Sequence, residues 1–369
     1  MANIDIRHGV MLLIGLGFVY LAITKEWEPL ELLPIGLGII VANLPLTGMS
    51  QSPAEASGYQ EAGLFGIVFH YGLAFWNILP PIIFLGIGAM TDFTSLISNP
   101  KTLLLGAAAQ VGIFVAFWGA LAVKFTIEEA AAIGIIGGAD GPTTIFLSAR
   151  LAPELLGVTA VIAYSYMAGV AFIQPPLMKL LTTEKERNIV MKPSREVSRA
   201  EKLLLPAVAM ILIILVVPRA APLVSMLMIG NLFRESGVVP RLSDAASNEL
   251  LNIATIFLML TVGTQLVADR VFDIDTLLIL GLGLVAFSVG TMSGVIFAKM
   301  MNLVVKDKVN PLIGSAGVSA VPMAARISHQ VGQQANPNNY LISHAMGPNV
   351  AGVIGSAVIA GVFVSMISS

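Results

Sequence analysis

The chain has 369 residues, of which 56% are hydrophobic and only 11% are charged. A soluble domain usually carries about 25% charged residues, so this composition, with a mean hydropathy of +0.86, indicates a polytopic membrane protein. The net charge of −2 gives no sign of nucleic-acid binding, and the absence of cysteine excludes disulfides, thiolate metal sites and cysteine nucleophiles.

The apolar segments predict an all-α fold with about 11 transmembrane segments, since about 20 residues are needed to cross ~30 Å of hydrocarbon. The first segment lacks an A-x-A cleavage site, so we expect it to be a retained helix. Segments 64–76 and 221–233 are short for a span, and 64–76 is either interfacial or part of a tilted span with the residues that follow. The full set comprises 9–23, 30–46, 64–76, 79–97, 102–124, 128–147, 157–181, 203–217, 221–233, 250–267, 277–301, 312–327 and 341–367.

One strongly charged stretch divides the chain. Residues 183–202 carry six basic side chains against four glutamates, and the positive-inside tendency predicts a cytoplasmic linker. It separates an N-terminal membrane region, 1–182, from a C-terminal one, 203–369. An even number of spans before the linker places the N-terminus on the same side of the membrane as the linker. Five spans after the linker place the C-terminus on the opposite side. Lys299, Lys306 and Lys308 are then expected near that opposite, outer face.

The stretch Gly137–Thr144, with the sequence GGADGPTT, interrupts a long apolar run. Its glycines remove side chains, and Pro142 removes a backbone N–H and clashes with the preceding helical turn. We therefore expect a broken membrane helix with free carbonyls, which is tolerated only where it is buried in protein or lines a watery cavity. Asp140, at the break, costs roughly 3 kcal/mol or more there unless a cation or a donor offsets its charge.

Two interpretations of Asp140 are open. Carbonyls, two threonine hydroxyls and one carboxylate form an all-oxygen set that suits a small hard cation such as Na⁺ or H⁺. Alternatively, Asp140 only caps the half-helix that follows the break. The first interpretation is favoured because an aspartate is an expensive cap at membrane depth.

The two halves of the chain are alike in sequence. Ile83–Leu85 matches Ile256–Leu258, and the spacing of Gly134, Gly137 and Pro142 recurs at a second break. The repeats are expected at about 78–182 and about 250–369, each with a broken helix. An odd number of crossings between equivalent points inverts the second repeat relative to the first, which is typical of secondary-transporter-like architectures with an ion site where the breaks meet.

The second break runs from Asn310 to Pro322 and offers further oxygen ligands. Asn310 and Ser319 can complete a shell around a cation at Asp140, although Ser319 can instead bond to its own helix. Arg326 binds an anion, pairs with a carboxylate or snorkels to the membrane edge. Tyr166 follows the first break and either faces the cavity or anchors an interface.

These residues resemble a known family, the beta subunits of sodium-pumping biotin-dependent decarboxylases that act on oxaloacetate, methylmalonyl-CoA, glutaconyl-CoA or malonate. The resemblance covers nearly the whole chain. It is carried by Gly137–Thr144, by Asn310–Ser319, by Asn231–Leu250 with its RESG sequence, and by His344–Val350.

The resemblance implies an enzyme subunit that decarboxylates carboxybiotin on a carrier protein, consumes a proton and exports Na⁺. It implies that Asp140, Asn310, Gly314 and Ser319 serve the Na⁺ path. Tyr166 and Ser319 become candidates for the coupled proton movement, and Arg326 for contact with carboxybiotin or a structural pair.

The resemblance also implies the setting of the subunit, in the inner membrane. Biotin would come on a carrier subunit, since no soluble domain here could bind it covalently. A carboxyltransferase alpha subunit would choose the substrate, a small membrane subunit would complete the complex, and the chain would form a homodimer or homotrimer.

From the residues alone, a different function is also open: a cation-coupled secondary transporter, either a Na⁺/carboxylate symporter or a Na⁺/H⁺ antiporter. Asn310 and Arg326 could offer the amide and basic groups that a carboxylate needs. A purely structural scaffold would not explain Asp140.

Overall fold

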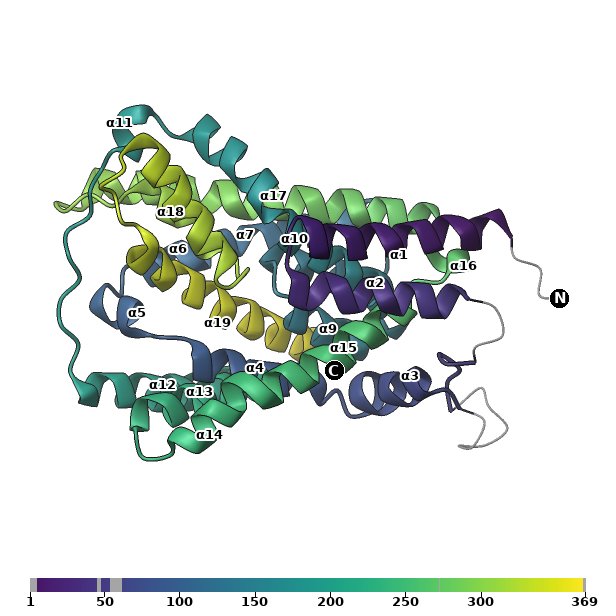
Figure 1. Cartoon of the computed structure of the whole chain (residues 1–369). Coiled ribbons are helices and arrows are strands. Elements are labelled where there is room, and N and C mark those ends of the chain that lie inside the picture. The colour runs from purple at the N-terminus through teal and green to yellow at the C-terminus, as the bar shows by residue number, and fades with distance from the viewer. Residues whose placement is uncertain (1–4, 45–47, 54–61, 272, 368–369) are drawn as a thin grey trace.

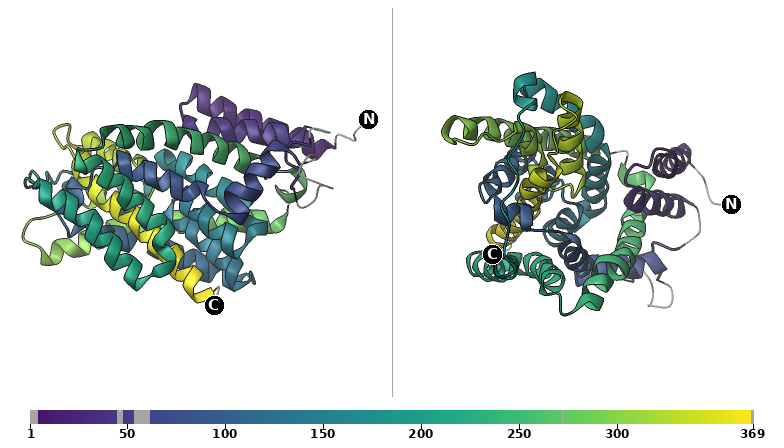
Figure 2. Two further views of the ribbon diagram at one scale, coloured as in Figure 1. Left: turned by 90° about the horizontal axis from the view of Figure 1, so that it is seen from below. Right: turned by 60° about the vertical axis from the view of Figure 1, so that its left-hand side comes forward.

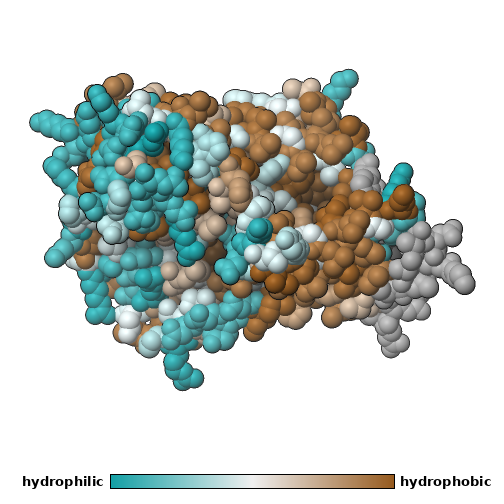
Figure 3. Space-filling view, turned by 45° about the horizontal axis from the view of Figure 1, so that its top comes forward, coloured by the Kyte–Doolittle hydropathy of each residue, from teal (hydrophilic) through white to brown (hydrophobic). Residues whose placement is uncertain are grey.

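A computed structural model of the chain describes residues 5–44, 48–53, 62–271 and 273–367. The described residues form helices and connecting segments without a strand. This agrees with the all-α fold expected from the sequence. Hydrophilic side chains gather at the end of the molecule where α11 (Glu184–Arg187) and α18 (Met323–Ala335) lie, and hydrophobic ones dominate the rest of the face shown in Figure 3.

The helices of the first half precede the charged linker. They are α1 (Ile6–Thr24), α2 (Pro29–Asn43), α3 (Leu64–Ile67), the π-helix η1 (Val68–Phe75), α4 (Leu79–Met90), α5 (Thr94–Ser98), α6 (Thr102–Ala109), α7 (Val111–Ala122), α8 (Ile127–Gly134), the 3-10 turn η2 (Ile135–Gly138), α9 (Gly141–Leu151), η3 (Pro153–Leu155) and α10 (Leu156–Leu181).

After α11 the second half follows. It contains α12 (Arg199–Val216), η4 (Pro218–Ala220), α13 (Ala221–Ser236), α14 (Pro240–Ala245), η5 (Ala246–Leu250), α15 (Leu251–Thr264), α16 (Ala268–Val271), α17 (Ile274–Val304), η6 (Pro311–Gly317), α18 and α19 (Ile342–Ile367).

Six described helices, some of them joined runs, are long and apolar enough to cross a membrane. A seventh span results if 64–75 and 79–90 are counted as one, although they are bent by 77°. The predicted number of about 11 is larger because it includes short and broken helices, and it stays a prediction. The six are Ile6–Thr24, Thr102–Ala122, Pro153–Leu181, Pro240–Thr264, Ile274–Val304 and Ile342–Ile367.

The packing between the two halves is reciprocal. Helix α2 packs against α15, while α13 packs against α4. Helix α10 contacts α17 and α18, while α19 contacts α6 and α9. Figure 2 shows α1 and α2, in purple, at the edge of the molecule. Each half therefore completes its packing with helices of the other half.

Close contacts between glycines and backbone carbonyls show the same reciprocal packing of the two halves. A Cβ at Gly88 would lie 2.0 Å from the Leu227 carbonyl oxygen, and a Cβ at Gly263 would lie 2.3 Å from that of Ile35. Only glycine allows backbones to approach this closely. The reverse contacts join Gly230 to Leu85 and Gly38 to Leu260.

Several helix ends lie on a different side of the molecule from the side that the sequence predicts. Lys299 lies 3.2 Å from Glu186, and Lys192 lies 2.6 Å from Asp307. The lysines expected at the far face therefore lie beside the linker. The first residues of α1, in contrast, lie at the opposite end of the molecule from α11 (Figure 1). The lysines lie there because 221–233, too short to be expected as a full span, forms α13, which packs against α12 and returns the chain. The position of α1 differs because 128–147 does not form a single straight span: its halves α8 and α9 pack against each other.

Candidate ion site at the crossing of the two breaks

Asp140 lies between η2 and α9 and is only 4% exposed. The preceding residue, Ala139, has a left-handed backbone with φ of 52°, which ends the 3-10 turn. The Oδ1 atom of Asp140 accepts a hydrogen bond from the Thr143 backbone N–H at 3.2 Å, so the carboxylate does cap α9. The helix cap provides a hydrogen-bond partner for Oδ1 of Asp140 but not for Oδ2.

The other oxygen, Oδ2, accepts hydrogen bonds from two serines of the second half. The Ser356 hydroxyl, on α19, donates at 2.6 Å, and the Ser319 hydroxyl, in the second break, donates at 3.2 Å. The Ser319 backbone N–H also donates to the Gly138 carbonyl at 2.8 Å. The two breaks therefore meet, and Ser319 bonds to the facing carboxylate instead of to its own helix.

Three more buried side-chain oxygens lie on or next to helices that form or contact the breaks. None of the three has a hydrogen-bond partner among the described residues. They belong to Thr143, Gln110 and Asn349. The Asn349 amide group donates to the Ala316 and Val318 carbonyls at 3.0 and 2.9 Å, which fixes the orientation of this side chain. Carboxylate, hydroxyl and amide oxygens are the ligands preferred by hard cations.

A cavity of about 390 Å³ reaches Asp140 and Ser319. It lies between α2, α4 and α15 on one side and the two breaks with α10 on the other. Its polar lining residues are Glu28, Glu31, Asp140, Tyr164, Asn252, Thr255, Ser319 and Arg326. The sequence analysis identified three of these, Asp140, Ser319 and Arg326. The structure brings them to one cavity.

Arg326, in the first turn of α18, is exposed at this cavity. Within the part of the chain that the structure describes, no carboxylate lies within ion-pair distance of its guanidinium group. Glu28 is near enough for the two charges to interact electrostatically. Arg326 is thus available to an anion that enters the cavity.

Tyr166 does not line the cavity. Its ring packs against Gly283 of α17, and its hydroxyl donates a hydrogen bond to the Leu280 carbonyl. Tyr164 lines the cavity instead: it is 1% exposed, and its hydroxyl has no partner among the described residues. Two residues correspond to about 200° of helix rotation, so these tyrosines lie on different faces of α10.

Asn310 and Gly314 also lie apart from Asp140. The Asn310 amide group donates to the Arg187 and Ile189 carbonyls at 2.9 and 2.8 Å, so it anchors the linker. Gly314 packs against Gly294, where a Cβ would lie 2.1 Å from the Gly294 carbonyl oxygen. Both positions shape the second break and do not contact the carboxylate.

The sequence analysis missed Ser356, Gln110, Tyr164, Glu28 and Glu31 as residues near the site. Ser356 lies in the apolar C-terminal part of α19, two turns beyond Pro348 and Asn349, so no local pattern singles it out. A signal existed for Glu31, because a carboxylate two residues into an apolar helix is costly in a membrane.

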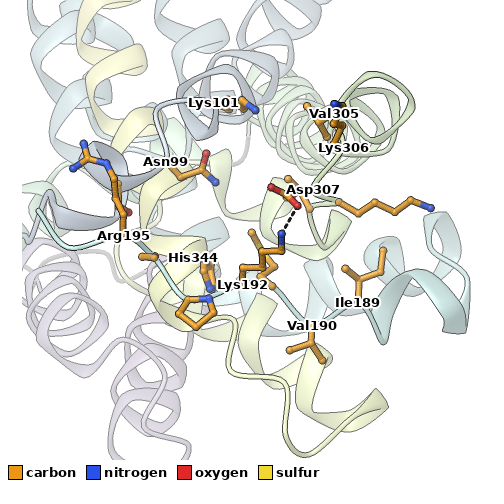
Figure 4. A pocket seen from close by; sticks show the side chains of 16 residues that line it. Asn99, Lys101, Ile189, Val190, Lys192, Arg195, Val305, Lys306, Asp307 and His344 are labelled. Carbon is orange, nitrogen blue, oxygen red and sulfur yellow. Dashed lines mark hydrogen bonds and ion pairs between the residues drawn. The ribbon is translucent and has the colours of Figure 1, made fainter.

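A second cavity, of about 420 Å³, lies at the linker end of the molecule (Figure 4). Its walls come from 98–101, from the linker at 189–195, and from 305–309, with His344 beside them. Lys192 donates to Asp307 across it and holds the pKa of that carboxyl below its usual range. Arg195 of the linker donates to the Ile97 carbonyl at 3.2 Å, so the linker is bonded to both halves at this end.

These features define a multi-pass membrane protein in which a buried carboxylate lies where two broken helices from different halves cross. The chain belongs to the family described as the Na⁺-transporting oxaloacetate decarboxylase beta subunit, which matches residues 7–367. The family accounts for the resemblance seen in the sequence, and it makes the chain a subunit of a decarboxylase complex that transports sodium.

Individual relatives extend this result. The chain is 58% identical to the methylmalonyl-CoA decarboxylase subunit beta of Propionigenium modestum, over 97% of this chain and 94% of that protein. It is 54% identical to the glutaconyl-CoA decarboxylase subunit beta of Acidaminococcus fermentans, over 98% and 93%. It is 50% identical to the oxaloacetate decarboxylase beta chain 2 of Salmonella typhi, over 98% and 95%.

Proposed function

We propose that this subunit decarboxylates carboxybiotin carried by a partner subunit, consumes one proton and couples the reaction to Na⁺ export. The observation that carries the proposal is the Asp140 carboxylate, which faces two serine hydroxyls at the crossing of the breaks and opens to a cavity. Such a carboxylate is costly in the membrane unless a cation neutralises it.

The chemistry assigns roles to Asp140 and Arg326, two of the charged groups of the cavity. In the reaction the N–COO⁻ bond of carboxybiotin breaks, CO₂ leaves, and the ureido nitrogen takes a proton. Asp140, with Ser319 and Ser356, holds either Na⁺ or a proton, so the two ions compete for one charge. Arg326, exposed in the same cavity, would contact the carboxylate of carboxybiotin.

We further propose that the chain is built from two inverted repeats longer than those expected from the sequence. The reciprocal packing of α2 on α15 and α13 on α4 supports units that begin with α1 and with α12. The same shift along the chain relates Gly88 to Gly263 and Leu85 to Leu260. The units are 6–181 and 199–367, and residues 182–198, within the charged stretch, link them.

The linker is proposed to be cytoplasmic. The lysines at 101, 192, 306 and 308 gather at one cavity at this end, which supports the positive-inside assignment. A Ser194→Cys variant tests it, since the chain has no native cysteine. A membrane-impermeant thiol reagent should label it only after the membrane is opened, and labelling from outside intact cells would overturn the assignment.

The subunit requires partners for this function. We propose a biotin carboxyl carrier subunit, a carboxyltransferase alpha subunit and a small membrane subunit, assembled with a homodimer or homotrimer of this chain in the inner membrane. The names of the relatives, all beta subunits or beta chains, support a multi-subunit complex. The family also favours the decarboxylase over the secondary-transporter alternative.

The central experiment measures CO₂ release by the reconstituted complex against Na⁺ concentration. Asp140→Asn should assemble normally and lose Na⁺-dependent decarboxylation, because an amide cannot offset the dehydration of Na⁺. Asp244→Asn, which removes an exposed carboxylate from α14, is the matched control and should behave as wild type. Normal Na⁺ activation of the Asp140 variant would refute the proposal.

A further inference from the structure

A third cavity, of about 350 Å³, contains Arg150 and Arg219, two arginines that have no role in the proposed mechanism. Arg150 lies in the last turn of α9, in the first half of the chain, and Arg219 lies in η4, in the second half. Helix α19 contacts both α9 and η4, and a Cβ at Gly361 would lie only 2.6 Å from the Ala220 Cβ. The cavity therefore lies where both halves meet at the C-terminal part of α19. Its other lining residues are Ala74, Phe75, Asn77, Ala149 and Val364.

The two arginines give this cavity unbalanced positive charge. Their guanidinium groups are near enough to repel each other electrostatically. Within the described ranges, neither group forms an ion pair or donates a hydrogen bond. The Arg150 guanidinium carbon lies 4.8 Å from the centre of the Phe146 ring, which holds it by a cation–π contact. Like charges at one cavity are destabilising unless an anion neutralises them, and guanidinium groups match phosphate oxygens bidentately.

Asn77 supplies an independent second observation. It is 5% exposed, and its amide group donates to the Phe146 carbonyl at 2.8 Å, which fixes the orientation of the side chain. Its backbone has the left-handed conformation, with φ of 50°, that asparagine tolerates better than most residues. The Oδ1 atom is buried and has no hydrogen-bond partner among the described residues. An unpaired acceptor beside two cations suits a ligand that carries a hydroxyl group next to its phosphate.

The position of the cavity favours a lipid as this ligand. Helix α12 runs from the linker to just before Arg219, and α10 runs from just after Arg150 back to the linker, so both arginines are remote from the linker. Basic residues at this end run against the positive-inside tendency and call for a specific reason. Large exposed apolar side chains, which suit contact with lipid, occur just before Arg219 and beside Asn77: they are Leu215, Val216, Phe75 and Trp76.

We propose that Arg150 and Arg219 bind the phosphate of an anionic phospholipid with a glycerol headgroup, phosphatidylglycerol being the simplest, in the leaflet on the side opposite the linker. The phosphate bridges the two guanidinium groups, a headgroup hydroxyl donates to Asn77, and the acyl chains lie along the apolar surface beside Leu215. Basic pockets between membrane helices bind lipid headgroups in this way. The bound lipid joins the two halves, and the inference does not depend on the proposed function.

The test counts lipids by native mass spectrometry of the purified, delipidated complex in a neutral detergent, titrated with phosphatidylglycerol. Wild type should bind one more phosphatidylglycerol per chain of this subunit than the double variant with Arg150→Gln and Arg219→Gln. Arg241→Gln, which removes an exposed arginine from α14, is the matched control and should bind as wild type does. Equal lipid counts for wild type and the double variant would overturn the inference.

Thermal unfolding distinguishes the lipid from other sources of negative charge. Phosphatidylglycerol should raise the unfolding temperature of wild type by about 2 °C or more beyond its effect on the double variant. Phosphatidylcholine and inorganic phosphate, at the same concentration, should affect both proteins equally. A shift with inorganic phosphate that the double variant lacks would assign the site to free phosphate and refute the lipid. Loss of another subunit from the double variant, with an unchanged lipid count, would assign the arginines to an acidic protein segment instead.

A milder variant covers the case in which the double variant does not assemble. Arg219→Lys keeps the positive charge and removes the planar fork that grips two phosphate oxygens. Its affinity for phosphatidylglycerol should be about tenfold weaker than that of wild type. An unchanged affinity would refute the site.

Discussion

Ser319 and Asp140 are joined across the two halves of the chain although they are far apart in sequence. The Ser319 hydroxyl donates to the Asp140 carboxylate at 3.2 Å, and the adjacent backbone contact, from Ser319 N–H to the Gly138 carbonyl, measures 2.8 Å. A side-chain contact supported by a backbone contact fixes the relative position of the two breaks. It allows one carboxylate to be shared by both halves.

The two serines should differ in their effect on Na⁺ activation. Ser356 donates at 2.6 Å and Ser319 at 3.2 Å to the same oxygen, so Ser356→Ala should be the more damaging change. A hydrogen bond to a charged group contributes about 1.5–3 kcal/mol, which corresponds to a rise of about tenfold or more in the Na⁺ concentration for half-maximal activity. Ser365→Ala, whose hydroxyl donates to the Gly361 carbonyl of its own helix, is the control. Equal Na⁺ profiles for all three variants would contradict this role.

The crossing of the breaks can be trapped covalently. A variant with Asp140→Cys and Ser319→Cys should form a disulfide on mild oxidation, because the backbones touch and no native cysteine interferes. A direct disulfide needs Cα atoms within about 7 Å. Crosslinking within one chain, detected as a mobility shift after cleavage in the linker, checks it. Failure of both oxidant and short bifunctional reagents would show that the breaks do not meet in the membrane.

Tyr166→Phe tests the proton role that the resemblance implied. In the structure its hydroxyl bonds to the Leu280 carbonyl, away from the cavity. We therefore expect a loss of about 1 kcal/mol of stability with little change in the Na⁺ and pH profiles of decarboxylation. A variant that stays folded but has a shifted pH profile would restore Tyr166 to the proton path.

Asn310→Ala should act through the linker. The Asn310 amide group holds the Arg187 and Ile189 carbonyls, and Asn339 holds the same two at 3.1 and 3.2 Å. Losing one of these two amides should make the linker more accessible to protease and lower the thermal stability, while the Na⁺ dependence of the assembled complex changes little. Asn338→Ala, on the exposed loop nearby, is the control. A large rise in the required Na⁺ concentration without linker loosening would instead support the Na⁺-path role.

The Lys192–Asp307 pair should contribute to stability only above acidic pH. Lys192 lowers the pKa of the Asp307 carboxyl, so the stabilisation is present above the unfolded pKa of about 4 and is lost as pH falls through the lower folded pKa. Both side chains are mostly exposed, at 78% and 73%, so the effect is small. The thermal unfolding temperature of the Asp307→Asn variant should be slightly lower than that of wild type at pH 7. The two temperatures should be equal well below pH 4. A difference that grows on acidification would contradict the assignment.

The sequence by itself determined the membrane class, the positions of both breaks and the linker, and the presence of a carboxylate, Asp140, at the first break. Each of these is a local property: an apolar run, a Gly/Pro interruption or a charged stretch acts on the residues that contain it. The charged linker and the glycine pattern therefore appear in the structure where the sequence places them, between Leu181 and Arg199 and around Gly137.

Only the tertiary structure decided which side chains share a site. Tyr164 and Tyr166 are equally plausible in sequence, but the rotation of α10 turns Tyr164 to the cavity and Tyr166 to α17. Ser356 reaches Asp140 because α19 packs on α9, and Asn310 is drawn away by the linker carbonyls. These outcomes depend on how helices distant in sequence pack, where buried polar groups must find partners, and no local pattern contains that information.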